Sequence, residues 1–179
     1  RGIVALDVGS APGGWTQCLE TFSKQTGWPL GEIIAVDPAE MQVGVERGTT
    51  SPKGTTKNEE SCKISITHIK CKIEAAIPTI KGLLDDGGKP GRVDLVVCDM
   101  NCAPLPLFEV AVLGPLSAGI LSRGACPCLT LKTFCGGRRK AADERMELRK
   151  RLLDVGVTWI EELKTMANSA TETTILCGF

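Results

Sequence analysis

One string constrains the fold of this chain more than any other: Asp7-Val8-Gly9-Ser10-Ala11-Pro12-Gly13-Gly14-Trp15. It follows the apolar run of residues 3–8 and leads into a helical pattern over residues 15–23. A Gly-rich turn between a buried strand and a helix is the setting of nucleotide-type binding loops. Small residues let the backbone approach a ligand closely, and the start of a helix offers free N–H groups that suit a carboxylate. The string therefore indicates a small-molecule site and is more specific than a generic tight turn.

The rest of the chain alternates between strand and helix patterns. Short apolar or alternating runs predict strands over residues 3–8, 32–36, 63–69, 93–98, 125–131, 157–163 and 173–177. Helical spacing predicts helices over residues 15–23, 73–84, 106–121 and 141–154, and residues 41–61 are expected to form a long surface loop. Such alternation predicts an α/β fold with a doubly wound, mostly parallel sheet, whose ligands bind beyond the carboxyl ends of the strands.

Composition sets the outer bounds. The chain has 179 residues, which suits one domain over residues 1–179, and 42% of them are hydrophobic. No apolar run approaches the ~20 residues of a transmembrane helix, so no membrane association is expected. The chain opens with Arg1-Gly2 directly on a strand, which suggests a fragment that lacks its N-terminal region.

The cysteines are read as buried thiols. There are nine, none in a C-x-x-C pair, and His68 is the single histidine, so no metal site is expected. Several lie in apolar strand patterns, where a free thiol behaves as a small hydrophobe. Reduced cysteines predict a reducing intracellular compartment: cytoplasm, nucleolus or organelle.

Net charge is +0, which argues against strong nucleic-acid binding by the whole surface. One basic run is a candidate RNA-binding surface: Arg138, Arg139, Lys140, Arg145 and Arg149. Acidic neighbours such as Asp143 and Glu147 make a solvated helix face an equally good interpretation.

The string from Asp7 to Trp15 resembles the cofactor signature of FtsJ-like RNA 2′-O-methyltransferases. The resemblance implies a seven-stranded Rossmann-like methyltransferase sheet with an antiparallel last strand. It also implies S-adenosyl-L-methionine as cofactor and an RNA substrate, with ribosomal RNA as the expected class. It implies that the Gly13-Gly14-Trp15 turn meets the methionine part and that Asp37 meets the ribose. The implied cofactor-binding set is Asp7, Gly9, Ala11, Pro12, Gly13, Gly14, Trp15, Asp37 and Asp99.

The family's catalytic set is Lys-Asp-Lys-Glu. Asp99 after the fourth strand, Lys132 at the end of the fifth and Glu172 at the start of the last match its final three members. The first Lys is expected upstream of Arg1. The segment Cys98-Asp99-Met100, followed by Ala103-Pro104, is most similar to the bacterial rRNA cytidine 2′-O-methyltransferase branch.

The resemblance implies that Lys132 accepts the proton of the ribose hydroxyl, while Asp99 and Glu172 orient it and the cofactor. Taken alone, Lys132 would be interpreted as a snorkelling lysine at a strand end. The chain departs from the family at one point. Family members often carry an acidic residue after the third strand that receives the adenine amino group, whereas residues 69–72 contain none.

Two other functions remain open from the sequence. Cys102 stands three residues after Asp99, the offset of the nucleophile in RNA cytosine-C5 methyltransferases, although Asn101 replaces their proline. A catalytically silent methyltransferase fold, acting as a structural subunit, is the other alternative. Either way, an upstream or partner RNA-binding domain would explain the neutral charge.

Overall fold

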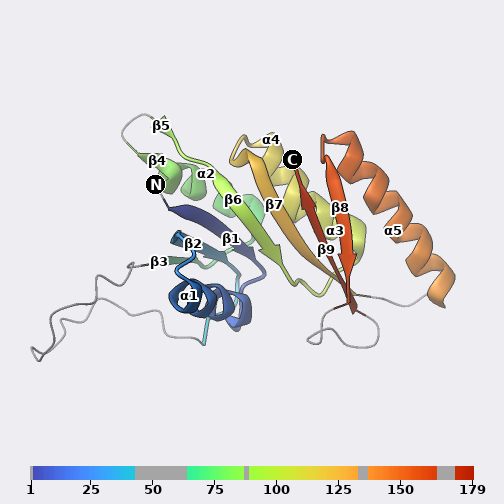
Figure 1. Ribbon diagram of the computed structural model, residues 1–179, viewed down its shortest axis with the longest axis horizontal. Coiled ribbons are helices and arrows are strands. Elements are labelled where there is room, and N and C mark those ends of the chain that lie inside the picture. The colour runs from blue at the N-terminus through green and yellow to red at the C-terminus, as the bar shows by residue number, and fades with distance from the viewer. Residues whose placement is uncertain (1, 43–63, 87–88, 133–136, 165–171) are drawn as a thin grey trace, which may run out of the picture.

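A single seven-stranded sheet organises the molecule (Figure 1). The computed structural model describes residues 2–42, 64–86, 89–132, 137–164 and 172–179. The strands of the sheet are β1 (Ile3–Val8), β2 (Leu30–Val36), β3 (Ser65–Ile69), β6 (Val93–Cys98), β7 (Leu121–Lys132), β8 (Trp159–Leu163) and β9 (Glu172–Gly178). Two short strands, β4 (Asp85–Asp86) and β5 (Lys89–Pro90), form a separate hairpin.

The strand order is β3-β2-β1-β6-β7-β9-β8. The first five of these run parallel, whereas β9 is antiparallel to both β7 and β8. From β1 the chain first adds β2 and β3 on one side and then β6 and β7 on the other. This change of side is a topological switch point, and ligands of such sheets bind in the crevice beyond the carboxyl ends of the two strands that meet there, β1 and β6. The predicted doubly wound sheet with an antiparallel last strand is confirmed.

Helices cover the two faces of the sheet unequally. They are α1 (Gly14–Thr26), α2 (Ile73–Leu84), α3 (Pro104–Phe108), the π-helical segment η1 (Glu109–Leu113), α4 (Gly114–Ser117) and α5 (Gly137–Asp154). Residues of α2, α3, η1 and α5 share the larger buried cluster with one face of the strands. Among the described helices, α1 alone contributes to the smaller cluster on the opposite face, through Leu19.

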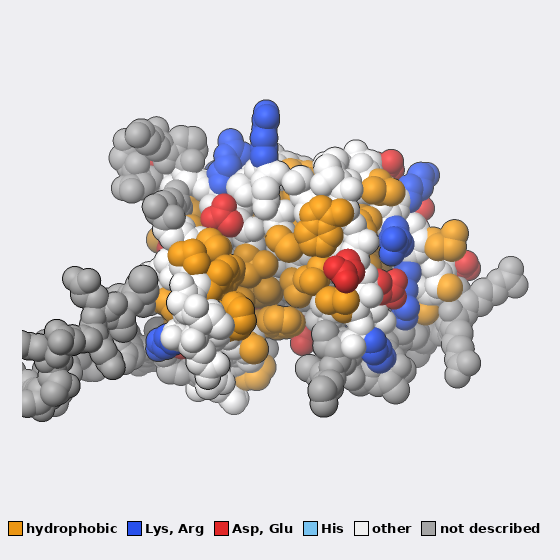
Figure 2. Space-filling view, viewed as in Figure 1, with side chains coloured by type: hydrophobic (Ala, Val, Ile, Leu, Met, Phe, Trp, Pro, Cys, Tyr) orange, Lys and Arg blue, Asp and Glu red, His pale blue; other side chains and the backbone are white. Residues whose placement is uncertain are grey.

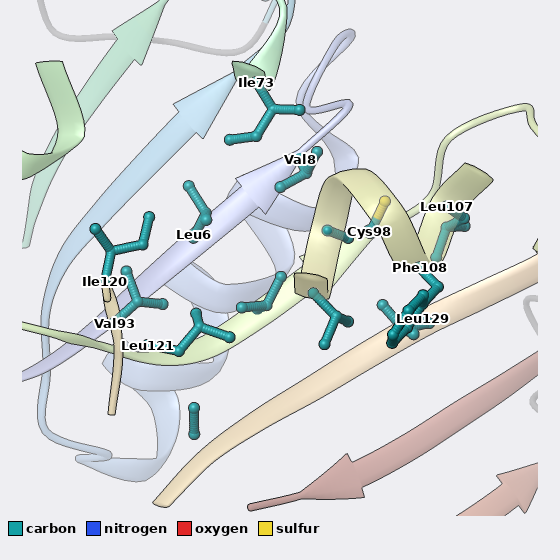
Figure 3. Close-up of a cluster of buried hydrophobic side chains, with 14 of the residues drawn as sticks. Leu6, Val8, Ile73, Val93, Cys98, Leu107, Phe108, Ile120, Leu121 and Leu129 are labelled. Atoms are coloured by element: carbon teal, nitrogen blue, oxygen red, sulfur yellow. The ribbon is translucent and has the colours of Figure 1, made fainter. Parts of the chain in front are cut away.

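The larger cluster is a dry core between the central strands and their helices. Leu6 of β1, Phe108 of α3 and Leu129 of β7 are almost wholly buried in it. Figure 3 shows Phe108 next to Leu129, where α3 crosses over β7. Since close-packed apolar contacts resist deformation, this core fixes the strand ends that carry polar side chains.

The helix after β6 differs from its prediction. It was expected over residues 106–121 but ends at Ser117, and β7 already begins at Leu121. Its middle widens into η1, where the Gly114 N–H donates to the carbonyl of Glu109, five residues back. Pro115 lacks an N–H and cannot continue a regular α-helix, which accounts for a local change of hydrogen bonding at this point.

Part of the sheet face beside α1 is open among the described residues. Leu95 and Leu176 are partly buried there, and Trp159 at the sheet edge is 45% exposed. Hydrophobic side chains gather over the middle of the face shown in Figure 2. No described helix is long and apolar enough to cross a membrane. The loop predicted for residues 41–61 lies outside the described residues beyond Gln42.

Candidate cofactor and catalytic site

A cavity of about 630 Å³ lies beyond the carboxyl ends of β1, β2, β6 and β7. This volume is in the range of pockets that hold drug-sized ligands. Its lining residues are Val8, Gly9, Ala11, Pro12, Val36, Asp37, Pro38, Cys71, Lys72, Ile73, Glu74, Asp99, Met100, Asn101, Val110 and Lys132. The sequence-predicted residues Gly9, Ala11, Pro12, Asp37, Asp99 and Lys132 therefore come together around one space.

The loop after β1 is held in place by the end of β2. The N–H groups of Gly9 and Ser10 donate to the Val36 carbonyl at 2.9 and 3.3 Å, and the Ala11 N–H donates to Oδ2 of Asp37 at 3.2 Å. Asp37 also accepts from the Ala39 N–H at 2.7 Å through Oδ1. Asp37 thus fixes both the loop and the turn that follows β2.

The loop after β1 adopts a backbone conformation at two positions that favours glycine. Gly9 has φ 76° and Gly13 has φ 116°, a region that residues with a side chain rarely adopt. A Cβ on Gly9 would also lie 2.5 Å from Cγ of Met100. The β1 loop and the segment after β6 therefore pack at a distance that only glycine allows.

The end of the predicted cofactor turn does not contribute to the cavity lining. Gly13, Gly14 and Trp15 are not among the described residues that line the cavity. Trp15 packs against the apolar cluster beneath α1. Its role in cofactor binding stays a prediction.

Asp7 is buried beneath the loop. It is 0% exposed, and its Oδ2 accepts a hydrogen bond of 2.6 Å from Oγ1 of Thr16. Within the described part of the chain, its Oδ1 and the Ser10 hydroxyl are buried without a hydrogen-bond partner. Burial raises the pKa of Asp7 to about 6, although hydrogen bonds from Thr16 oppose the increase.

Lys132 and Asp99 meet at one edge of the cavity. Nζ of Lys132 lies 3.2 Å from Oδ1 of Asp99 and 3.5 Å from the Asp99 carbonyl oxygen. Oδ1 is buried yet accepts no hydrogen bond among the described residues, so its contact with Nζ is an ion pair without hydrogen-bond geometry. Glu172 faces Lys132 directly, as its partner in the antiparallel register of β7 and β9.

Glu74 is a pocket residue that sequence reasoning missed. It lies in the first turn of α2 and lines the cavity with Cys71 and Lys72. Residues 69–72 contain no acidic residue, but Glu74 stands two positions further along the chain. An acidic residue in the first turn of the following helix was the signal available in the sequence.

The described part of the predicted basic surface on α5 is paired with acidic residues. Arg145 and Arg149 both pair with Glu162 of β8, at 3.0 and 3.9 Å, and Lys140 lies 3.8 Å from Glu144. The side chains of Arg138 and Arg139 lie outside the described residues. The solvated-face interpretation therefore describes part of this helix, and its role in RNA binding stays a prediction.

The described cysteines are free thiols, and none of the described residues forms a cluster that could hold a metal ion. Burial raises the pKa of Cys98, Cys128 and Cys177 to about 12. These three thiols therefore behave as small hydrophobes.

A family model for FtsJ-like methyltransferases matches residues 1–162. The chain belongs to the FtsJ-like methyltransferase family. This membership confirms the predicted family and the expected cofactor, S-adenosyl-L-methionine. A search of curated proteins gave no match.

Solved structures share the fold of this FtsJ-like methyltransferase at low sequence identity. A protein of Plasmodium falciparum described as a ribosomal RNA methyltransferase has a TM-score of 0.60 and 14% identity, covering 99% of this chain and 86% of its own. The fibrillarin pre-rRNA processing protein of Methanococcus jannaschii has a TM-score of 0.61 and 11% identity, covering 100% and 67%. Fibrillarin of Aeropyrum pernix, solved with natively bound S-adenosyl-L-methionine, has a TM-score of 0.59 and 14% identity, covering 100% and 67%.

Proposed function

We propose that this FtsJ-like methyltransferase transfers a methyl group from S-adenosylmethionine to a ribose 2′-hydroxyl of RNA, with ribosomal RNA as the first substrate class to test. The observation that carries the proposal is Lys132 at the edge of a cofactor-sized cavity, with Asp99 at 3.2 Å and Glu172 opposite in register. These residues match the Asp, the second Lys and the Glu of the catalytic set that the resemblance to the family implies.

The lining residues suit the chemistry of the cofactor. Asp37 offers carboxylate oxygens to the two ribose hydroxyls, which are donors. Glu74 offers an acceptor to the adenine amino group, at the α2 end of the cavity. Asp99 lines the cavity, and its carboxylate suits the ammonium group of the methionine part.

When bound, S-adenosylmethionine would supply a methyl carbon open to attack by a nucleophile, with the carbon–sulfur bond breaking and the positively charged sulfur leaving as a neutral thioether. A ribose hydroxyl is a poor nucleophile until its proton is shared, and Nζ of Lys132 is the basic group at the cavity edge. Asp99 holds Nζ in place, and Glu172 limits its position from the adjacent strand.

The cytosine-C5 alternative draws less support. Burial raises the pKa of Cys102, and the nearby Lys132 opposes the increase only in part. A nucleophilic cysteine needs a thiolate, so a raised pKa works against this role. Cys102 is also not among the described residues that line the cavity, whereas Asn101 is.

The test is methyl transfer from labelled S-adenosylmethionine to RNA, followed by digestion to nucleosides. The expected product is a 2′-O-methylated nucleoside, lost in Lys132→Ala and retained in Lys24→Ala, a surface lysine paired with Glu20. A 5-methylcytosine product abolished by Cys102→Ser would establish the alternative. Cofactor binding without transfer to any RNA by the full-length protein would point to the catalytically silent subunit.

A further inference from the structure

The charges around the cavity are unbalanced. The charged side chains that line it are Asp37, Lys72, Glu74, Asp99 and Lys132. Asp7 does not line the cavity, but it is buried one residue before Val8, which does, and the charges of the lining residues Asp37 and Asp99 act on its carboxyl. Acidic groups therefore outnumber basic ones, and one of the two lysines is already paired with Asp99.

Asp7 is the least solvated of these carboxyls. It is 0% exposed, Thr16 hydrogen bonds to one of its oxygens, and the other has no hydrogen-bond partner among the described residues. Repulsion from Asp37 and Asp99 adds to the effect of burial, and together they raise the pKa of Asp7 to about 6. An ionised carboxylate in such a place is costly unless a positive charge lies nearby.

Resting on the proposed function, we propose that the buried carboxylate of Asp7 is a counter-charge by which the cavity distinguishes the cationic cofactor from its neutral-sulfur product. This preference is present only while Asp7 is ionised. S-adenosylmethionine and S-adenosylhomocysteine share their adenosine, ammonium and carboxylate groups and differ by one methyl group and one positive charge at sulfur. A fixed negative charge in a poorly solvated wall therefore favours the methylated form.

The same charge assists turnover, since the product has lost the positive charge that Asp7 attracts. Asp7 touches neither the substrate nor the reacting atoms in this scheme, so it is a positioning charge rather than a catalytic residue. Lys132 contributes the opposite sign but is held by Asp99 at 3.2 Å.

The pH dependence follows from the sign of the interaction. A cation in the cavity favours ionised Asp7, so cofactor binding releases a proton near pH 6, and the preference for the cation falls as pH decreases through this value. The charged groups that act on Asp7 are Asp37 after β2 and Asp99 after β6, with Thr16 of α1 as its hydrogen-bond donor. His68 of β3 lies 3.2 Å from the Asp37 carbonyl, so His68→Gln serves as a further control.

The experiment is calorimetric titration of the purified protein with S-adenosylmethionine and with S-adenosylhomocysteine between about pH 5 and about pH 8. The ratio of the two dissociation constants should change roughly tenfold across this range in favour of S-adenosylmethionine at high pH. In Asp7→Asn the ratio should stay constant with pH. Asp94→Asn is the matched control, because Asp94 is a partly buried strand aspartate that accepts from the Val4 N–H at 3.1 Å and does not line the cavity.

A second variant keeps the test decisive if Asp7→Asn does not fold. Thr16→Val removes a hydrogen bond that favours ionised Asp7, so the pH at which the preference is lost should move upward. An unchanged pH profile in either variant would overturn the proposal, as would a profile abolished by His68→Gln. Failure of both compounds to bind at every pH would instead overturn the proposed function itself.

Discussion

Nζ of Lys132 lies 3.2 Å from Oδ1 of Asp99, although the two residues are far apart in the sequence. Lys132 is the last residue of β7, and Asp99 directly follows β6. Parallel pairing of these strands places their carboxyl ends side by side. The ion pair is therefore a consequence of the sheet, and it places a basic group and a carboxyl at the edge of one cavity.

Asp99→Asn should reduce methyl transfer by about a hundredfold or more, because it removes the charge that holds Lys132. Lys132→Arg should fail as well, since arginine cannot act as a base. Single-turnover transfer from labelled cofactor measures both effects. Near wild-type turnover in Lys132→Arg would contradict the role of Lys132 as base.

Glu172→Ala should reduce transfer less than Lys132→Ala, by about tenfold, because its proposed role is orientation. The matched control is Glu161→Ala, an exposed residue of the neighbouring strand β8. The comparison of kcat among the three variants decides the order. A loss in Glu172→Ala as large as that in Lys132→Ala would assign Glu172 a direct part in proton transfer.

Asp7→Asn should stabilise the cofactor-free protein at about pH 8 by about 2 to 3 kcal/mol. The pKa of Asp7 is raised from 3.8 to about 6 in the fold, so its ionisation destabilises the native state as pH rises through this window. The stability difference between variant and wild type should vanish below about pH 4. Denaturant unfolding at both pH values measures it; a destabilised variant at high pH would indicate a purely structural carboxylate.

Gly9→Ala should weaken cofactor binding strongly, because φ is 76° and a Cβ would lie 2.5 Å from Cγ of Met100. Gly82→Ala in α2 is the control, since a Cβ there meets nothing within 4 Å. Calorimetry with S-adenosylhomocysteine gives both affinities. Equal affinities in the two variants would remove the β1 loop from the cofactor site.

Glu162→Gln should strengthen RNA binding at low salt, if α5 borders the RNA, because Glu162 pairs with Arg145 and Arg149 and offsets one of their two positive charges. Arg149→Glu should have the opposite effect, and both effects should diminish as salt increases. Filter binding or fluorescence anisotropy over a salt series measures the slopes. If neither substitution changes the affinity for RNA, the RNA binds another surface or another domain.

The sequence by itself determined the strand–helix alternation and the local loop. Alternating apolar runs and helical spacing gave α2 and β6 at their observed bounds, because these patterns depend on near neighbours in the chain. The residues Asp7 to Trp15 specified a tight turn, and the backbone of Gly9 and Gly13 explains why glycine stands there. Asp99, Lys132 and Glu172 were found by resemblance to the family, at strand ends that the pattern itself marked.

The tertiary structure decided which of these residues meet and what each one experiences. Burial raises the pKa of Asp7, Glu74 joins the cavity from the first turn of α2, and Glu162 pairs with Arg145 and Arg149 of α5. None of these effects is local, because desolvation and ion pairing depend on groups brought together by the sheet. The π-helical turn before Pro115 could likewise not be predicted from the sequence, because the spacing of apolar residues does not distinguish hydrogen bonds to the fifth preceding residue from those to the fourth. Periodicity therefore fixed the elements, whereas packing between distant strands set the charges and contacts of the site.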